Sequence, residues 1–209
     1  MGIPFLVAPS EAEAFCSFLC LKNHVDYVAT EDMDALTFGA PLVLRNFTAG
    51  QSKKVPVLEY NLSQILKDLN LNMNEFIDLC ILLGCDYCDT LKGVGLKKAL
   101  GLIKKYRTIE KIIEEDNVVK KDNNGKLDYD FNFDDARTIF KELIFLESDF
   151  KEEDLKIKWN EIDLEKIKDF LVKEKQFDEV RVTNGVNKLI ASQKKPKQSK
   201  LDRFFIKKG

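Results

Sequence analysis

The segment DYVATEDMDALTFGAPLVLRNF, residues 26–47, decides the fold class, because two strand-like runs in it flank a short acidic stretch. Residues 27–30 and 41–47 are apolar and rich in residues that favour buried strands. Three acids, Glu31, Asp32 and Asp34, lie between them. Carboxylates crowded at a strand end repel one another unless a cation or the loop geometry makes their proximity tolerable.

The residues around this segment extend the same pattern. Residues 3–7 and 55–60 are further strand candidates, and a helix is expected from Ser10 to about Leu21. Ser10 and Glu13 have the spacing of a capping box at the start of that helix. Alternating strands and helices predict an α/β fold with a parallel sheet.

From Asn61 onward the pattern becomes helical. The helix at 74–83 is expected to be capped by Asn74 and ended by Gly84, and 117–132 is expected to be a loop. Further helices are expected at 61–69, from about Lys97 onward, after Thr108, and near 133–146, 163–174 and 178–190.

Composition limits the classes of protein that fit. The chain has 209 residues, 44% of them hydrophobic, which is enough for a folded core. The net charge of -2 conceals a basic tail: residues 192–209 hold seven Lys or Arg and one acid. A basic tail on an acidic body suggests a polyanionic partner or a tethered binding motif. We expect no membrane span and no signal peptide.

The five cysteines predict free thiols in a reducing compartment, because their number is odd. Cys85 and Cys88 form a C-x-x-C motif. A zinc site is disfavoured, because the chain has one histidine and no second pair at the required spacing. Cys16 and Cys20 are expected to be buried in a helix.

Five acids lie where an open α/β sheet usually binds its ligand, beyond the strand ends or next to a helix end. They are Glu11, Glu13, Asp32, Asp34 and Asp86. Together they could hold two Mg²⁺ ions of the kind that hydrolyse phosphodiesters. The alternatives are ordinary: Glu11 and Glu13 suit the first turn of a helix, Asp32 and Asp34 suit a turn, and Asp86 suits a loop.

A basic, glycine-containing segment follows Asp86. Glycines between two helices let a phosphate approach the backbone, and the next helix offers free N–H groups. This predicts a grip on the DNA backbone that ignores base sequence, with a solvated helical hairpin as the alternative. The residues concerned are Lys92, Gly93, Gly95, Lys97 and Lys98.

The tail carries an aliphatic residue and two aromatic residues on one face of a single helical turn. Such a face suits a groove on a partner, although it could also dock on the protein's own core. The residues are Gln198, Leu201, Phe204 and Phe205.

Taken together, blocks along the whole chain resemble the flap endonucleases of the XPG/Rad2 family of 5′ nucleases. The blocks are MGIPFLVAPSEAEA, ATEDMDALTFG, LCILLGCDYCDTLKGVGLKKAL, EKQFDEVRVTNGVNKL and QSKLDRFF. The resemblance implies a PIN-like (resolvase-like) α/β nuclease core with a helical helix-two-turn-helix extension. It also implies 5′ flap endonuclease and 5′–3′ exonuclease activity on branched DNA, in replication and base-excision repair.

The resemblance also implies roles for single residues. Glu11 and Glu13 would bind one Mg²⁺, and Asp32, Asp34 and Asp86 the other, whereas Glu31 is not a ligand. Glu11, Gly84 and Asp86 would lie near DNA, residues 92–98 would grip the duplex and hold K⁺, and the tail box from Gln198 to Phe205 would bind the sliding clamp PCNA.

Members of the family begin with a further region that supplies two more metal-binding aspartates and catalytic basic residues, which this sequence lacks. We therefore expect an N-terminally truncated core with little nuclease activity alone but intact clamp binding. The alternatives are a DNA- and clamp-binding module and an exonuclease 1-like or XPG-like relative.

The expected organisation has three parts. Residues 1–110 form the internal nuclease region, with the helix-two-turn-helix at about 75–106. Residues 111–191 form the helical C-terminal part of the core, and 192–209 form a disordered basic tail. We expect a monomer in the nucleus, with the nucleolus and mitochondrion added by the resemblance.

Overall fold

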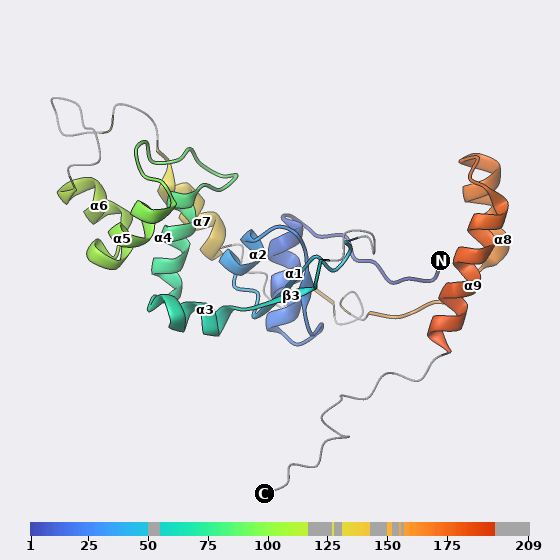
Figure 1. The fold of residues 1–209 in the computed structure, drawn as a ribbon. Helices are drawn as coiled ribbons and strands as arrows, with labels where there is room; N and C mark the ends of the chain where they lie inside the picture. The colour runs from blue at the N-terminus through green and yellow to red at the C-terminus, as the bar shows by residue number, and fades with distance from the viewer. Residues whose placement is uncertain are drawn as a thin grey trace, which may run out of the picture. The chain divides into compact units, whose positions relative to one another are not determined.

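The computed structural model describes residues 1–49, 55–116, 127, 131–142, 150–151, 155 and 157–194. The chain forms two compact units. The core unit is Val7–Lys156, and the terminal unit combines Met1–Leu6 with Ile157–Gly209. Figure 1 shows the elements of each unit.

The sheet of the core unit has three strands in the order β1-β2-β3. Their bounds are β1 Val28–Ala29, β2 Leu42–Arg45 and β3 Leu58–Asn61. As predicted, β1 and β2 are parallel, with Val28 paired with Val43. β3 is antiparallel to β2, with Leu42 paired with Asn61. The parallel-sheet prediction therefore holds for one of the two strand pairs.

The predicted strand at residues 3–7 is absent from the described part of the chain. Among the described residues the sheet consists of β1, β2 and β3, and none of these strands pairs with residues 3–7. Phe5 and Val7 are accordingly exposed. Apolar alternation alone does not make a strand without a backbone partner.

Two helices pack against the sheet. α1 spans Ala12–Leu21 and α2 spans Asp34–Thr37. Buried residues of α1, α2, β1 and β2 form one apolar cluster with Leu62 and Phe76. The predicted burial of Cys16 is wrong, since that side chain is exposed, whereas Cys20 is buried as expected.

The second half of the core unit is a helical assembly built around α4. Its helices are α3 Leu62–Leu69, α4 Met73–Leu83, α5 Leu96–Tyr106, α6 Ile109–Glu115 and α7 Phe133–Glu142. α4 contributes Phe76 to the sheet-side cluster and Ile77 and Ile81 to the helical cluster. It therefore joins the helices to the sheet (Figure 1).

The terminal unit is a small helical assembly. It contains α8 Leu164–Lys168, a π-helical segment η3 Asp169–Glu174, and α9 Glu179–Gln193. Ile167, Val182 and Val186 are its buried core. The N-terminal residues join it through a hydrogen bond of 3.0 Å from the Asn160 N–H to the Gly2 carbonyl.

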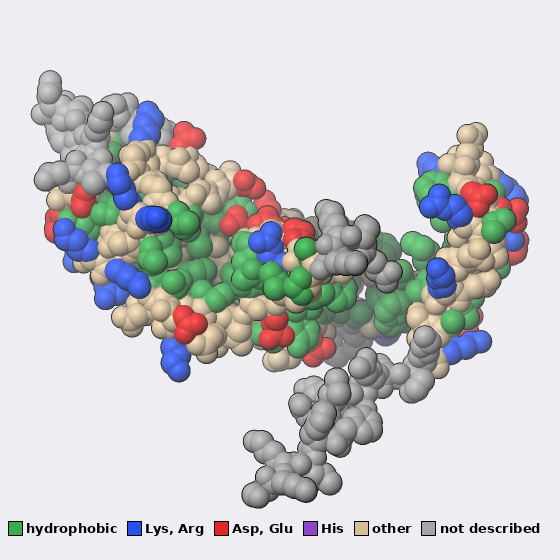
Figure 2. Space-filling model, viewed as in Figure 1, with side chains coloured by type: hydrophobic (Ala, Val, Ile, Leu, Met, Phe, Trp, Pro, Cys, Tyr) green, Lys and Arg blue, Asp and Glu red, His purple; other side chains and the backbone are tan. Residues whose placement is uncertain are grey.

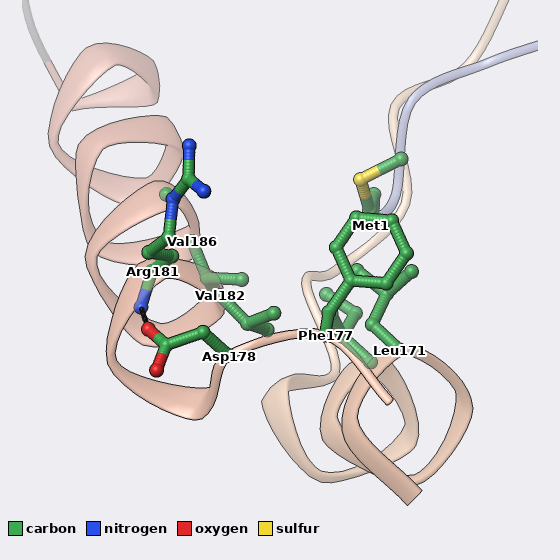
Figure 3. A pocket seen from close by; sticks show the side chains of 9 residues that line it. Met1, Leu171, Phe177, Asp178, Arg181, Val182 and Val186 are labelled. Carbon is green, nitrogen blue, oxygen red and sulfur yellow. Dashed lines mark hydrogen bonds between the residues drawn. The ribbon is translucent and has the colours of Figure 1, made fainter. Parts of the chain in front are cut away.

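A pocket of about 360 Å³ opens in this terminal unit. Figure 3 shows Phe177 and Leu171 facing Val182 and Val186 of α9 across it. At its edge the Asp178 carboxylate caps α9 by accepting the Arg181 N–H at 2.7 Å. Its lining is mainly apolar and includes none of the acids predicted to bind a metal.

In the described part of the chain, no helix is both long and apolar enough to cross a membrane.

Candidate metal and nucleic-acid site

The acidic stretch after β1 folds into a turn that leads into α2. The Asp32 N–H donates to Thr30 Oγ1 at 3.0 Å, and the Asp34 N–H donates to Asp32 Oδ1 at 2.9 Å. Asp32 thus shapes the turn, as the ordinary alternative anticipated. Asp34 is the first residue of α2 and is half-buried, so its carboxylate lies where the chain leaves the sheet.

Glu31 serves the same turn in another way. Its Oε1 accepts the Asn46 N–H at 2.8 Å, and its Oε2 lies 3.4 Å from Arg45 Nε. These contacts tie the acidic turn to the end of β2.

The acids of α1 do not form the predicted capping box. α1 begins at Ala12, its N-cap residue is Glu11, and no side-chain hydrogen bond caps it. The prediction that Ser10 caps this helix is therefore wrong. Glu11 has an extended backbone, which moves the start of the helix one residue along the chain. Glu13 lies in the first turn, where a carboxylate is favoured by the helix dipole.

Asp86 lies in a tight turn that follows α4. Gly84 ends α4 with φ of 110°, a conformation that favours glycine, which confirms the predicted helix end. Cys85 and Cys88 then form an isolated antiparallel bridge around Asp86 and Tyr87. The Tyr87 ring packs against Phe140, with their centroids 5.2 Å apart. The turn thus exposes Asp86 while an aromatic contact anchors it.

Electrostatics shows that the five acids lie in one neighbourhood. Burial, together with the negative charges of Asp32, Asp86 and Glu13, raises the pKa of Asp34 to about 6. Burial also raises the pKa of Tyr87, with added contributions from Glu11 and from the other acids of the turn. Figure 2 shows Asp and Glu side chains gathered near α2 and the loop after α4. Repulsion of this kind is relieved by a bound cation.

The acids are close enough to repel one another but do not form a finished coordination shell. No group of three or more His, Cys, Asp or Glu side chains in the described ranges is arranged to hold a metal ion. Mg²⁺ commonly keeps several waters and contacts only one or two carboxylates directly. Carboxylate oxygens are the donors that such a hydrated hard cation takes.

The predicted backbone grip is a loop followed by a helix. Gly93 has φ of 84°, and Gly95 is the N-cap of α5. A methyl group added at Gly95 would meet nothing within 4 Å, so the space before this helix is open. Lys98 Nζ donates to the Gly93 carbonyl at 3.2 Å, which braces the loop, while Lys92 and Lys97 are exposed. Figure 2 shows Lys and Arg side chains over the α5 and α6 region.

The sequence did not predict one network of ion pairs, which is centred on Arg137. Arg137 of α7 contacts the buried carboxylate of Asp78 in α4, with Nε–Oδ1 at 2.8 Å and Nη2–Oδ2 at 2.9 Å. Its Nη1 also contacts Glu110 Oε1 at 2.6 Å, and Asp78 accepts the Ile109 N–H at 3.2 Å. This network fixes α6 and α7 on α4. The sequence signal for this network is that Asp78 lies among apolar residues of a predicted helix.

The predicted loop at 117–132 lies largely outside the described residues, and so does the predicted clamp-binding tail.

The sequence and fold of this chain are similar to those of known proteins. Residues 2–86 match the XPG I-region. The chain is 54% identical over 207 residues to flap endonuclease 1 of Encephalitozoon cuniculi, covering 99% of this chain and 57% of that protein. The chain therefore spans a little more than half the length of this relative.

Solved structures show the same relationship. A flap endonuclease-1 structure from Methanococcus jannaschii matches with a TM-score of 0.71 and 32% identity, covering 90% of this chain and 53% of that one. The catalytic core of Rad2, solved in complex with DNA substrate, matches with a TM-score of 0.61 and 26% identity. That match covers 85% of this chain and 62% of the Rad2 chain.

Proposed function

Because this chain belongs to the XPG/Rad2 nuclease family, we propose that it acts in metal-dependent, structure-specific 5′ cleavage of flapped DNA. The single observation that carries the proposal is the position of the half-buried Asp34 beside Asp32, Asp86 and Glu13, whose charges, with burial, raise the pKa of Asp34. Carboxylates gathered in this way repel one another and destabilise the folded protein unless a bound cation neutralises their charge.

We assign the cation site to Glu11, Glu13, Asp32, Asp34 and Asp86. The turn hydrogen bonds fix the backbone between Asp32 and Asp34, and the Tyr87 contact fixes the turn of Asp86. The proposed ions are two Mg²⁺, which when bound activate water and stabilise the leaving oxygen of a phosphodiester. The chain's own contribution is to hold these carboxylates at one edge of the sheet and to orient them.

DNA would be held by its backbone rather than by its bases. Glu11, Gly84 and Asp86 border the cation site, while Lys92, Gly93, Gly95, Lys97 and Lys98 form the grip before α5. The open space beside Gly95 and the free N–H groups at the start of α5 suit a phosphate. We propose a K⁺ ion at this loop. The substrate class is then branched duplex DNA, chosen by shape.

The tail residues Gln198, Leu201, Phe204 and Phe205 are proposed to bind the sliding clamp PCNA, which places the protein in nuclear replication and base-excision repair. We extend this placement to the nucleolus and mitochondrion, and propose a monomer. A pull-down with the clamp tests the tail. The double variant Phe204→Ala/Phe205→Ala should lose binding, and Lys207→Ala/Lys208→Ala should keep it. Equal binding of the aromatic variant and the parent would refute the assignment.

Cleavage of a 5′-flapped duplex tests the catalytic proposal. Under single-turnover conditions with saturating chain, the weak Mg²⁺-dependent cleavage expected of this chain alone should be lost in Asp34→Asn and Asp86→Asn. The matched control Glu31→Gln should keep it, because Glu31 contacts Asn46 and Arg45 instead. Cleavage that persists in EDTA, or that survives both aspartate substitutions, would contradict the proposal.

A second candidate is a module that binds DNA and clamp without cleaving. It is favoured by the lack of a finished metal-ligand group among the described residues. Selective binding of the flapped duplex, with no cleavage by the parent in Mg²⁺ or Mn²⁺, would support this candidate over the nuclease.

A further inference from the structure

Cys85 and Cys88 are placed as a dithiol pair on the turn that carries Asp86. Their sulfur atoms lie 3.8 Å apart, and both side chains are half-buried. Both cysteines are free thiols. By contrast, the thiol of Cys20 is directed to a carbonyl, that of Asp26, at 3.6 Å. The pair is therefore a local arrangement of two sulfurs that face each other.

The backbone at this pair already suits a disulfide. Cys85 and Cys88 are partners in an antiparallel bridge. Directly opposed residues of an antiparallel pair have Cα atoms roughly 4.5–5.5 Å apart. A disulfide requires Cα atoms about 4.4–6.8 Å apart, so rotation of the two side chains could close the bond without moving the chain.

We propose that Cys85 and Cys88 are a reversible oxidation site that controls the cation site through Asp86. The oxidant is a low-molecular-weight disulfide of the glutathione class. One cysteine sulfur attacks it, forming a mixed disulfide and releasing one thiol. The second cysteine sulfur then displaces the other thiol and closes the Cys85–Cys88 bond. The pair loses two electrons and two protons, and the oxidant is reduced to two thiols.

The link to Asp86 follows from its position between the two cysteines, and it rests on the proposed function. Asp86 is exposed on this turn, so its orientation toward a cation depends on the backbone between Cys85 and Cys88. Tyr87 already anchors the turn against Phe38 and Phe140. A covalent bond across the turn removes the remaining freedom of Asp86. The oxidised protein should therefore bind a divalent cation more weakly, by about tenfold, the scale seen when groups that orient metal ligands are altered.

Intact-mass and peptide mapping test the site itself. The full chain is treated with oxidised glutathione, and unreacted thiols are blocked with iodoacetamide. The peptide containing Cys85 and Cys88 should lose two hydrogens and escape alkylation, and a reductant should reverse both changes. Cys85→Ser and Cys88→Ser should each show a glutathione adduct at the remaining thiol instead. Full alkylation of both cysteines in the treated parent would overturn the proposal.

A binding titration with Mn²⁺, followed by electron paramagnetic resonance, tests the control of the cation site. The reduced parent and the double variant Cys85→Ser/Cys88→Ser should bind Mn²⁺ with the same affinity. Treatment with oxidised glutathione should leave the affinity of the double variant unchanged. The same treatment should weaken Mn²⁺ binding by the parent about tenfold. Equal affinity of the oxidised and reduced parent would overturn the control. If the reduced parent binds no Mn²⁺ while the disulfide still forms, the metal assignment fails and the oxidation site stands.

Discussion

Asp34, a proposed metal ligand, reduces the stability of the metal-free protein at neutral pH because its carboxyl is half-buried beside other acids. Its raised pKa means that the folded, metal-free protein holds a proton more tightly than the unfolded chain, whose carboxyl has its ordinary pKa of 3.8. Folding stability from this group is therefore present below about pH 4 and is lost as the pH rises through about 6.

Asp34→Asn should remove that loss. In EDTA at pH 7.5 we expect the variant to be more stable than the parent by about 1 kcal/mol. This is less than the full pKa shift implies, because solvent screens the charge of a half-exposed group. The two proteins should differ little in stability near pH 4. Urea unfolding at the two pH values measures this. The control Asp89→Asn changes an exposed acid of the Asp86 loop and should alter stability little. A parent as stable as Asp34→Asn at pH 7.5 would contradict the expectation.

Arg137 is the second residue whose role is set by its surroundings. Arg137→Ala should lower the free energy of unfolding by about 3–5 kcal/mol, because it leaves the buried Asp78 carboxylate without its partner. Lys173→Ala, which removes an exposed pair with Asp169, is the control and should cost less than about 1 kcal/mol. Chemical denaturation distinguishes them, and similar costs for the two variants would show that the buried network contributes little.

At the scale of elements, helix ends show where sequence patterns succeed and fail. α6 begins after Thr108 and α4 ends at Gly84, both as predicted. The start of α4 was misplaced, since Asn72 and not Asn74 is its N-cap. Both asparagines precede the apolar run, and Glu75 decides between them, because its carboxylate reaches back to the Asn72 N–H at 2.9 Å.

This distinction can be measured. Asn72→Ala should cost about 1 kcal/mol of stability, because it removes the acceptor for the Glu75 N–H and breaks the reciprocal cap. Asn74→Ala is the matched control, an exposed position in the first turn of the same helix, and should change stability by less than about 0.5 kcal/mol. Thermal denaturation of the two variants checks this. A larger loss from Asn74→Ala would mean that the cap lies elsewhere in solution.

At the scale of the whole molecule, charge is divided between sites. Asp and Glu side chains gather near α2 and the loop between α4 and α5, while Lys and Arg side chains lie over the α5 and α6 region (Figure 2). Under the proposed function, a cation binds among the acids while the basic region holds a phosphate backbone. The positions of the two sites depend on α4, because it packs against both the sheet and α5.

Removal of the lysines should weaken DNA binding in a salt-dependent manner. For Lys97→Ala/Lys98→Ala, the slope of log affinity against log salt should fall by about 0.9 for each phosphate that the variant no longer neutralises. The control Lys166→Ala/Lys173→Ala removes two exposed lysines of the terminal unit and should leave the slope unchanged. Fluorescence anisotropy with a flapped duplex at several salt concentrations gives both slopes. Equal slopes for the two double variants would refute the grip before α5.

The sequence by itself determined most helices, the three paired strands and the five acids, because periodicity, capping residues and strand-end acids act locally. It could not determine that residues 3–7 lack a strand partner, that β3 runs antiparallel, or that Cys16 faces solvent. Those outcomes depend on which segments meet in space. The tertiary structure also decided that Arg137 reaches Asp78 across 59 residues and that Cys85 faces Cys88 around Asp86. Long-range contacts and side-chain directions arise only when the elements pack together, and no local pattern specifies them.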